Sequence, residues 1–199
     1  MISRRLGFGL LAGVLIVVAG LAVALARAPQ TSSVTATRCL TTADNAGCIR
    51  FPTVSGQNLA DKTLTLPDDF AGEHVLVLVP FDEDQQIRAE SWLPLAREIA
   101  AERADFAYYN TAIFTDINPA VRLLIRGGMV MAITDENLRA VTVTLFLEDR
   151  QAFLDALAIP NIEQTQVLLL NAAGEVLWRG TGDYTADQGA DLRETLAGF

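Results

Sequence analysis

The sequence predicts an α/β fold in which helices flank a central mixed β-sheet, together with one N-terminal transmembrane helix. Three observations support this prediction. Short apolar runs rich in Val and Leu alternate with segments of helical spacing, an order typical of helices packed on a sheet. Two late strands are separated by a Gly-containing turn, which predicts an antiparallel hairpin. The chain also begins with an uncharged apolar run of 21 residues, 6–26.

This N-terminal run is long enough to cross a membrane. As a helix, 21 residues would span roughly 31 Å, about the thickness of the hydrocarbon layer. Arg4 and Arg5 precede it, which favours a cytoplasmic segment 1–5 and export of the remainder. Segments 24–26 and 26–28 match small-x-small signal-peptidase sites, but the run is longer than the hydrophobic part of a signal peptide. We therefore expect a signal-anchor helix, single-pass in the cell inner membrane, with the C-terminal domain facing the periplasm.

Residues 27–48 are predicted to form a polar tether that contains the two cysteines of the chain, Cys39 and Cys48. An extracytoplasmic compartment permits disulfides. A bridge would close a short loop and stabilise the fold by roughly 2–3 kcal/mol in the chain-entropy model. Eight residues separate the two cysteines, so they form no C-x-x-C at a helix start. A structural staple is the simpler interpretation, and a redox pair is the alternative.

The globular domain is assigned to residues 49–199. Its first half reads as a hairpin, a strand buried on both faces, an amphipathic helix, an aromatic β-prone segment, and a helix opened by a proline and closed by two glycines. In order, these elements are residues 58–66, 74–81, 85–103, 106–114 and 119–128.

The second half of the domain gives clearer signals. A strand is followed by a short amphipathic helix closed by Pro160, and two strands of a hairpin are joined by a turn in which Gly174 suits a positive φ. A terminal helix follows with Thr185 as its N-cap. In order, the elements are residues 141–147, 150–157, 167–170, 175–179 and 185–196.

Composition and charge exclude some classes of function. Hydrophobic residues make up 51% of the chain and charged residues 20%, which is enough apolar material for a core. The formal net charge is −9, and setting aside the three arginines that flank the apolar run leaves −12 for residues 28–199. So acidic a domain repels nucleic acid and anionic lipid surfaces. We expect no nucleic-acid partner.

The residues for a metal site or a nucleophile–base pair are lacking. His74 is the one histidine of the chain, and a half-exposed structural role at the start of a strand is its simpler interpretation. The acidic run Asp82-Glu83-Asp84 lacks the spacing of a Ca²⁺ loop and is expected to cap the helix that follows it. We expect neither a metal nor a cofactor.

Three stretches of the domain resemble the thioredoxin-like superfamily in its extracytoplasmic, membrane-anchored form. They are NLADKTLTLPDDFAGEHVLVLVPF at 58–81, VTVTLFLEDRQAFLDALAI at 141–159 and VLLLNAAGEVLWRGTGDYTADQGADL at 167–192. The order and spacing of these stretches carry the resemblance, which implies a thioredoxin-like fold.

The same resemblance implies where redox chemistry would take place. Active members place a C-x-x-C or a peroxidatic Cys after the first central strand, facing a cis-proline that precedes the penultimate strand. The matching positions in this sequence are 81–86, which read Phe-Asp-Glu-Asp-Gln-Gln, and Thr165-Gln166. Because neither sulfur nor proline is present there, the resemblance implies a retained fold without dithiol chemistry, and we do not expect an enzyme of this type.

A narrower resemblance is to the mitochondrial ATP synthase assembly factor family, which is thioredoxin-like and also lacks the dithiol. The shared features are a Gln-rich entry to the first helix, the sequence Ser91-Trp92-Leu93-Pro94 within it, and the ending 174–182. Members of that family act as chaperones for a membrane subunit. The resemblance therefore implies an assembly role by analogy.

Four residues are candidates for partner binding: Trp178, Arg179, Asp82 and Asp84. Trp178 lies beside Arg179 in the last hairpin, and aromatic side chains often anchor interfaces. The alternative for Trp178 is core packing or a cross-strand pair, and the alternative for the two carboxylates is helix capping.

The leading hypothesis is a membrane-anchored, redox-inactive thioredoxin-like protein that binds other extracytoplasmic or membrane proteins or assists their assembly. The alternative is a thiol-disulfide oxidoreductase or peroxidase that uses Cys39 and Cys48 from a mobile arm. The sequence leaves the oligomeric state open.

Overall fold

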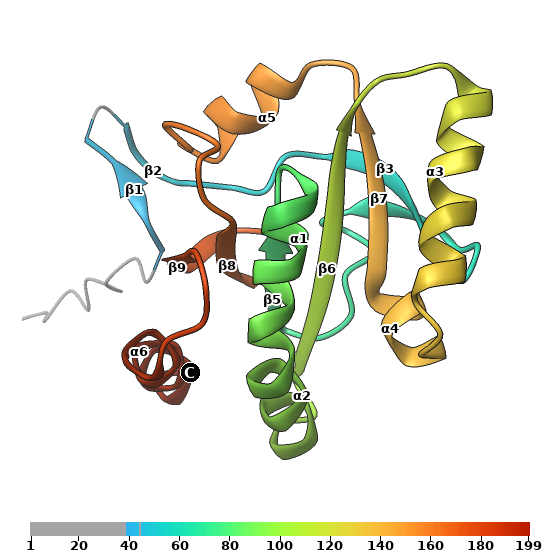
Figure 1. Cartoon of the computed structure of the whole chain (residues 1–199). Coiled ribbons are helices and arrows are strands. Elements are labelled where there is room, and N and C mark those ends of the chain that lie inside the picture. The colour runs from blue at the N-terminus through green and yellow to red at the C-terminus, as the bar shows by residue number, and fades with distance from the viewer. Residues whose placement is uncertain (1–38, 44) are drawn as a thin grey trace, which may run out of the picture. The chain divides into compact units, whose positions relative to one another are not determined.

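A mixed β-sheet forms the centre of the domain. The computed structural model describes residues 39–43 and 45–199, and within them seven strands form one sheet in the order β4-β3-β7-β6-β5-β8-β9 (Figure 1). The strands are β3 (Val54–Asn58), β4 (Thr63–Leu66), β5 (His74–Val79), β6 (Phe106–Thr115), β7 (Thr142–Leu147), β8 (Gln166–Asn171) and β9 (Val176–Thr181).

The strand directions confirm the predicted mixed sheet. β5, β6 and β7 run parallel, while β8 and β9 continue the sheet antiparallel on one side and the β3–β4 hairpin does so on the other. Leu76 of β5 lies opposite Tyr108 of β6 and Leu169 of β8. The hairpin predicted at 58–66 is confirmed, although its first strand begins earlier, at Val54.

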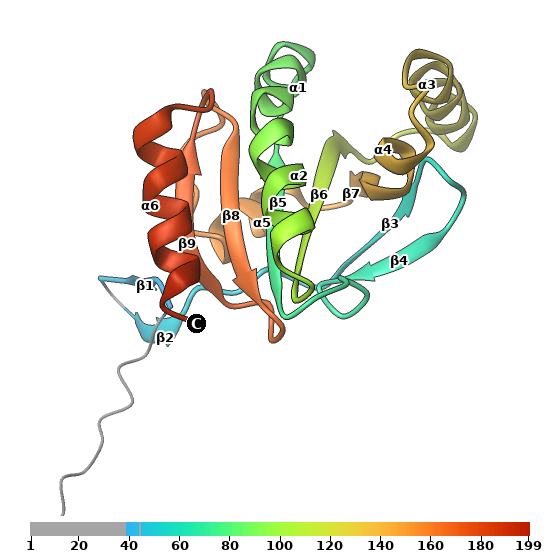
Figure 2. The same ribbon diagram turned by 90° about the horizontal axis from the view of Figure 1, so that it is seen from below.

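Helices cover both faces of this sheet. They are α1 (Glu83–Ala89), α2 (Leu93–Glu102), α3 (Pro119–Ala132), α4 (Glu136–Val141), α5 (Arg150–Ala156) and α6 (Ala186–Ala197). The helices α1, α2, α3, α4 and α6 lie on one face, and α5 lies on the other (Figure 2). Thr185 caps α6 as predicted, because its side chain accepts a hydrogen bond from the Gln188 N–H at 3.3 Å.

The centre of the core is β5, which is buried along its whole length. Its side chains alternate between the two faces, as a strand requires. Val75, Val77 and Val79 join the apolar cluster beneath α5, and Leu76 and Leu78 join the cluster beneath α1, α2 and α6. The continuous Val-Leu run at this position was the basis for predicting a strand buried on both faces, and the structure confirms it.

One predicted helix is divided in two. The segment 85–103 was expected to form a single helix, but a short 3-10 turn at Glu90–Trp92 separates α1 from α2. Pro94 lies in the first turn of α2, where its missing N–H needs no partner. A helix that continued through Pro94 would lose a backbone hydrogen bond and meet the proline ring, so the chain tightens into the 3-10 turn before it.

Two features of the α3–α4 region were not predicted. The pair Gly127-Gly128 was expected to end a helix, whereas α3 continues through both glycines to Ala132 and ends where Ile133 N–H bonds to the Met129 carbonyl at 2.9 Å. The short helix α4 then begins with Asp135 as its N-cap. Glycine lowers helix stability by only about 1 kcal/mol, which neighbouring contacts can offset.

Regular structure is also present before Ile49, in the segment predicted as a tether. The strands β1 (Thr41–Thr42) and β2 (Asn45–Cys48) form a small antiparallel hairpin. Its backbone is hydrogen-bonded to the main sheet, from Leu40 N–H to the Val176 carbonyl. The predicted transmembrane segment 6–26 lies outside the described residues. Within the residues that the structure describes, none of the helices has the length and apolarity needed to cross a membrane.

Candidate functional site

The disulfide predicted as a staple is present. Cys39 and Cys48 are bridged, with their Cα atoms 5.5 Å apart. Backbone hydrogen bonds fasten the flanks of this disulfide loop to the turn between β8 and β9: Leu40 N donates to the Val176 carbonyl at 2.7 Å, and Phe51 N donates to the Gly174 carbonyl at 2.8 Å. The loop is therefore attached to the sheet on both sides of the bridge.

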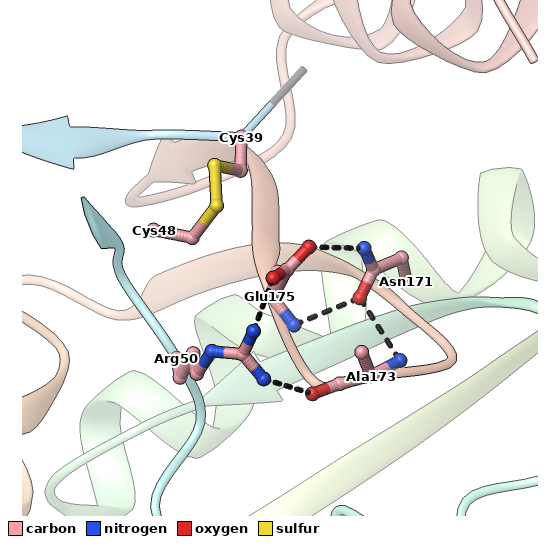
Figure 3. The surroundings of a disulfide bond; sticks show 6 residues. All are labelled: Cys39, Cys48, Arg50, Asn171, Ala173 and Glu175. Atoms are coloured by element: carbon pink, nitrogen blue, oxygen red, sulfur yellow. Dashed lines mark hydrogen bonds and ion pairs between the residues drawn. A yellow bond between two sulfur atoms is a disulfide. The ribbon is translucent and has the colours of Figure 1, made fainter. Parts of the chain in front are cut away.

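Side chains reinforce the same attachment (Figure 3). The Arg50 guanidinium forms an ion pair with Glu175 and donates to the Ala173 carbonyl at 3.4 Å. Asn171 then donates to the Glu175 carboxylate at 2.8 Å. These contacts fix the turn residues and the disulfide loop to each other, as expected of a structural bridge.

The disulfide loop and the start of α1 lie at opposite ends of β5. The turn between β8 and β9 lies at the amino end of β5, because His74 pairs with Asn171. Helix α1 begins after the carboxyl end of β5, a strand of six residues and hence roughly 20 Å long. In this structure the sulfur atoms are therefore held away from the position where dithiol chemistry takes place in thioredoxin-like oxidoreductases.

The start of α1 is occupied by a carboxylate and an amide. Asp82 is the N-cap, and its side chain accepts a hydrogen bond from the Gln85 N–H at 2.8 Å. The buried Gln85 side chain accepts from the Phe81 N–H at 3.1 Å and donates to the Ile162 carbonyl at 2.7 Å. Neither group is a nucleophile of the kind that a redox or acyl-transfer reaction needs. The expected capping role of Asp82 is confirmed.

The two segments that the resemblance placed opposite each other do meet. The hydroxyl of Thr165, which is fully buried just before β8, donates to the Gln85 carbonyl at 3.1 Å. Position 165 is thus in direct contact with the start of α1, although it carries threonine in place of proline. The fold brings these two segments together, and the residues that meet there are Gln85 and Thr165.

Trp178 lies in the core. Its side chain is only 6% exposed, packs with the cluster beneath α1, α2 and α6, and donates from Nε1 to Asp191 at 2.7 Å. Trp92 is fully buried beside it, with ring centroids 6.0 Å apart. Core packing, one of the two roles considered for Trp178, therefore describes this side chain, and a partner could not reach it without displacing α6.

Arg179 has a structural position as well. Its guanidinium donates to the carbonyl groups of Leu157 and Ala158, which follow the end of α5. Burial lowers the pKa of Arg179. Because a helix C-terminus attracts positive charge, this side chain satisfies the end of α5.

His74 is buried, at 7% exposure, where half-exposure was expected. Its ring lies 3.2 Å from the carboxylate of Asp105 and packs against Phe199. Within residues 39–43 and 45–199, His, Cys, Asp and Glu side chains form no group of three that could hold a metal ion.

The carboxylates at the start of α1 are exposed, and two of them, Asp82 and Glu83, line a cleft. Asp82, Glu83 and Asp84 are all exposed. A cleft of about 540 Å³ opens between α1 and α3 at the carboxyl ends of β5 and β6, and we call it the α1–α3 cleft. Its lining residues are Pro80, Phe81, Asp82, Glu83, Gln86, Ile87, Glu90, Ala112, Ile113, Phe114, Met129, Ala132 and Ile133.

The sequence did not identify this cleft, for two reasons. Met129, Ala132 and Ile133 form one wall, but the sequence placed them beyond the end of the helix. Gln86 and Ile87 were assigned to a helix without being recognised as cleft residues. The spacing of Glu83, Gln86, Ile87 and Glu90 at i, i+3, i+4 and i+7 was the available signal, since these positions share one face of a helix.

Solved structures of several proteins resemble this chain. A thiol:disulfide interchange protein from Bacteroides sp. has 20% identity and a TM-score of 0.51, over 77% of this chain and 90% of that one. BsSco, a member of the Sco family of cytochrome c oxidase assembly proteins, has 16% identity and a TM-score of 0.51, over 74% and 94%. A putative electron transfer protein from Aquifex aeolicus VF5 has 11% identity and a TM-score of 0.54, over 74% and 90%. No protein-family model and no curated protein sequence matches the chain.

Proposed function

We propose, from the thioredoxin-like fold that this chain adopts, that it is a redox-inactive protein which binds other extracytoplasmic or membrane proteins or assists their assembly. The single observation that carries the proposal is the start of α1, where Asp82 and Gln85 occupy the place of the dithiol. A thioredoxin-like oxidoreductase needs a thiolate at this helix start, because the helix end lowers the thiol pKa there. A carboxylate cap uses the same helix end for stability alone.

The placement of the cysteines supports the same proposal. The sequence contains two cysteines, and both are in the bridge at the other end of β5. Hydrogen bonds on both flanks hold this loop to the sheet, so a swing of the arm to α1 would have to break them. A staple that lowers the entropy of the unfolded chain accounts for the bridge without chemistry.

The neighbouring folds suggest both the proposal and its rival. BsSco belongs to a family of cytochrome c oxidase assembly proteins, so at least one protein of similar fold belongs to an assembly family. The Bacteroides protein is a thiol:disulfide interchange protein, which favours the alternative of an oxidoreductase using Cys39 and Cys48. The two hypotheses differ in one respect that can be measured, namely whether the cysteines exchange with a disulfide substrate.

The proposal includes the membrane. The uncharged run 6–26 behind Arg4 and Arg5 supports a signal-anchor helix in the inner membrane. The domain would then face the periplasm, where the Cys39–Cys48 bridge is stable. An anchor would keep the domain close to membrane proteins, which suits an assembly role.

The primary test is an exchange assay with the full chain reconstituted in phosphatidylcholine nanodiscs. Dithiothreitol is the reductant and insulin is the disulfide substrate. We expect insulin reduction to proceed at the rate of empty nanodiscs. Turnover above that blank would show that the chain is an oxidoreductase and would end the proposal.

Replacing both cysteines separates a staple from a reactive pair. The double variant Cys39→Ser/Cys48→Ser is expected to lose about 2–3 kcal/mol of unfolding free energy, from the entropy that the loop regains in the unfolded chain. Crosslinking in the native membrane should still recover the same protein partner as the unmodified chain. Loss of the partner in a variant that remains folded would favour the oxidoreductase.

A further inference from the structure

We propose that the α1–α3 cleft binds a segment of a partner protein that carries apolar side chains next to Lys or Arg. The inference deepens the proposed function and rests on it, because it assigns the surface and the chemistry of the partner. It does not involve the disulfide, which lies at the other end of β5.

The floor and one wall of the cleft are apolar. Phe81 and Ile113 are buried at its base, at 7% and 6% exposure, and Met129 and Ile133 form the wall that α3 contributes. Ile87 on the opposite wall is 65% exposed, so its side chain is accessible to whatever enters the cleft. The volume of about 540 Å³ lies in the range of roughly 300–1,000 Å³ typical of binding pockets.

The wall that α1 contributes is acidic. Glu83 of α1 and Glu90, which begins the 3-10 turn after α1, line the cleft together with Ile87, and Asp82 lies at the start of the same wall. Both glutamates are exposed and, among the described residues, neither forms an ion pair. Their charge is therefore directed at whatever enters the cleft.

Elsewhere in the domain, arginines pair with some of the acidic side chains, whereas others, such as Asp68 and Glu73, form no ion pair among the described residues. The acidic residues paired in this way are Asp61, Glu98, Glu102, Asp105, Asp116, Asp135, Glu175 and Asp183. The acidic wall of the cleft differs from these, since no arginine lies among the residues that line the cleft. A Lys or Arg from a partner is the complement that this wall lacks.

The charge of the domain favours a basic protein segment over a lipid surface. Residues 28–199 carry −12, which repels the anionic headgroups of a membrane. The same charge attracts a basic segment and raises its rate of association. The cleft therefore selects for positive charge and apolar character together.

The test uses short fluorescein-labelled peptides and the full chain in phosphatidylcholine nanodiscs, with empty nanodiscs as the blank. The probe GSKLLKGLKS combines leucines with lysines, GSELLEGLES replaces each lysine by glutamate, and GSKSSKGSKS replaces each leucine by serine. Fluorescence anisotropy measures binding. We expect the first peptide alone to bind, and more weakly at higher salt.

Matched variants locate the binding. The variant Ile87→Ser removes the apolar wall residue, and Glu83→Gln/Glu90→Gln removes the charges while keeping the shape. Each is expected to weaken binding of GSKLLKGLKS about two- to thirtyfold. The controls Leu124→Ser and Glu73→Gln/Glu194→Gln change exposed residues of the same types outside the cleft, and we expect no effect from them.

Three results would overturn the inference: no binding of GSKLLKGLKS, equal binding of GSELLEGLES, or equal losses in the control variants. None of these three results changes the outcome of the insulin-reduction assay, so the two proposals are tested separately. A failure of peptide binding with no insulin reduction would reject the cleft as the binding surface and keep a redox-inactive protein. Insulin reduction would reject the proposed function itself.

Discussion

At the scale of single residues, Gln85 links three parts of the candidate site. Its buried side chain bonds to the Phe81 N–H, to Asp82 and to the Ile162 carbonyl, so it joins the end of β5, the cap of α1 and the loop before β8. Removing it would leave the N–H of buried Phe81 without an acceptor and the Ile162 carbonyl without its donor, and a buried group left unpaired costs about 1–3 kcal/mol.

The variant Gln85→Ala is therefore expected to lower the free energy of unfolding by about 2–4 kcal/mol. Urea denaturation followed by circular dichroism measures this loss. Gln164→Ala is the matched control, since Gln164 is exposed, and it should change stability by less than about 0.5 kcal/mol. Equal losses in the two variants would contradict the linking role of Gln85.

Asp105 gives a prediction for pH dependence. Hydrogen bonds from the Arg103 guanidinium, at 3.0 and 2.7 Å, hold the pKa of this carboxyl well below its usual range. A carboxyl with a lower pKa in the folded state than in the unfolded state adds stability above its unfolded pKa, near about 4. That stability is lost as the pH falls through the folded pKa.

The variant Asp105→Asn should consequently be less stable than the unmodified chain at pH 7, and the difference should shrink as the pH falls below about 4. Urea denaturation at a series of pH values measures it. Asp68→Asn is the control, because Asp68 is exposed and has no ion pair among the described residues. A stability difference that grew toward acid pH would contradict the predicted direction of the pH dependence.

Some residue positions could not be predicted because a local irregularity decides them. The sequence placed Trp178 in a strand but did not decide whether its side chain faces the core or a partner. The register of β8 and β9 shifts between Leu169 and Leu170, so that Leu177 and Trp178 face the same core cluster although they are consecutive. A bulge of this kind breaks the period of two on which a sequence argument depends.

At the scale of elements, the patterns predicted strands better than helix ends. The Val-Leu runs of β5 and β8 are apolar throughout, and such runs have few alternatives in a chain of this length. The helix α3 was cut short at Gly127-Gly128, where the structure leaves open space around both Cα atoms. Glycine is only a weak helix breaker, and tertiary contacts decide whether the helix ends there.

The contact that holds α3 is unusual, because the residue of this helix that is buried is charged. Arg126 donates to the carbonyl groups of Gln57 and Asn58 and to the Thr144 hydroxyl, at 2.9 to 3.0 Å, and forms an ion pair with Asp61. Two leucines of α3, Leu123 and Leu124, are 73% and 76% exposed. The attachment of α3 thus depends on polar contacts more than on apolar burial.

The variant Arg126→Met is expected to lower stability by roughly 3 kcal/mol and to loosen α3 before the rest of the domain, because backbone acceptors in β3 lose their donor. Hydrogen exchange followed by mass spectrometry should show faster exchange in 119–132 and unchanged exchange in α2. Leu124→Ser should leave both segments unchanged. Uniform acceleration across the domain would mean that α3 does not open on its own.

At the scale of the whole domain, the two ends of β5 are built differently. The amino end carries the disulfide loop and the ion pairs around Glu175 and Asp105, which tie neighbouring segments together. The carboxyl end carries the α1–α3 cleft, with exposed apolar and acidic side chains. A binding protein needs one rigid part and one accessible part, and this division is the structural basis of the proposed function.

The membrane anchor is the remaining prediction at this scale. The run 6–26 has no charge, and a helix of that length crosses a bilayer, so the full chain should stay in the membrane pellet after washing with alkaline carbonate. A chain that begins at Ala28 should move to the supernatant. Alkaline phosphatase fused after Phe199 should be active in cells and green fluorescent protein at the same position dark, because we expect Arg4 and Arg5 to keep the N-terminus in the cytoplasm.

Mass spectrometry of the purified chain distinguishes an anchor from a cleaved signal peptide. An anchor leaves residues 1–27 on the chain, whereas cleavage after Ala26 or Ala28 removes the whole apolar run. Both outcomes export the domain, so the fusion assay alone cannot separate them. A mature chain that begins at residue 27 or 29 and washes off the membrane would contradict the anchor, and a partner in the membrane would then have to be reached by binding alone.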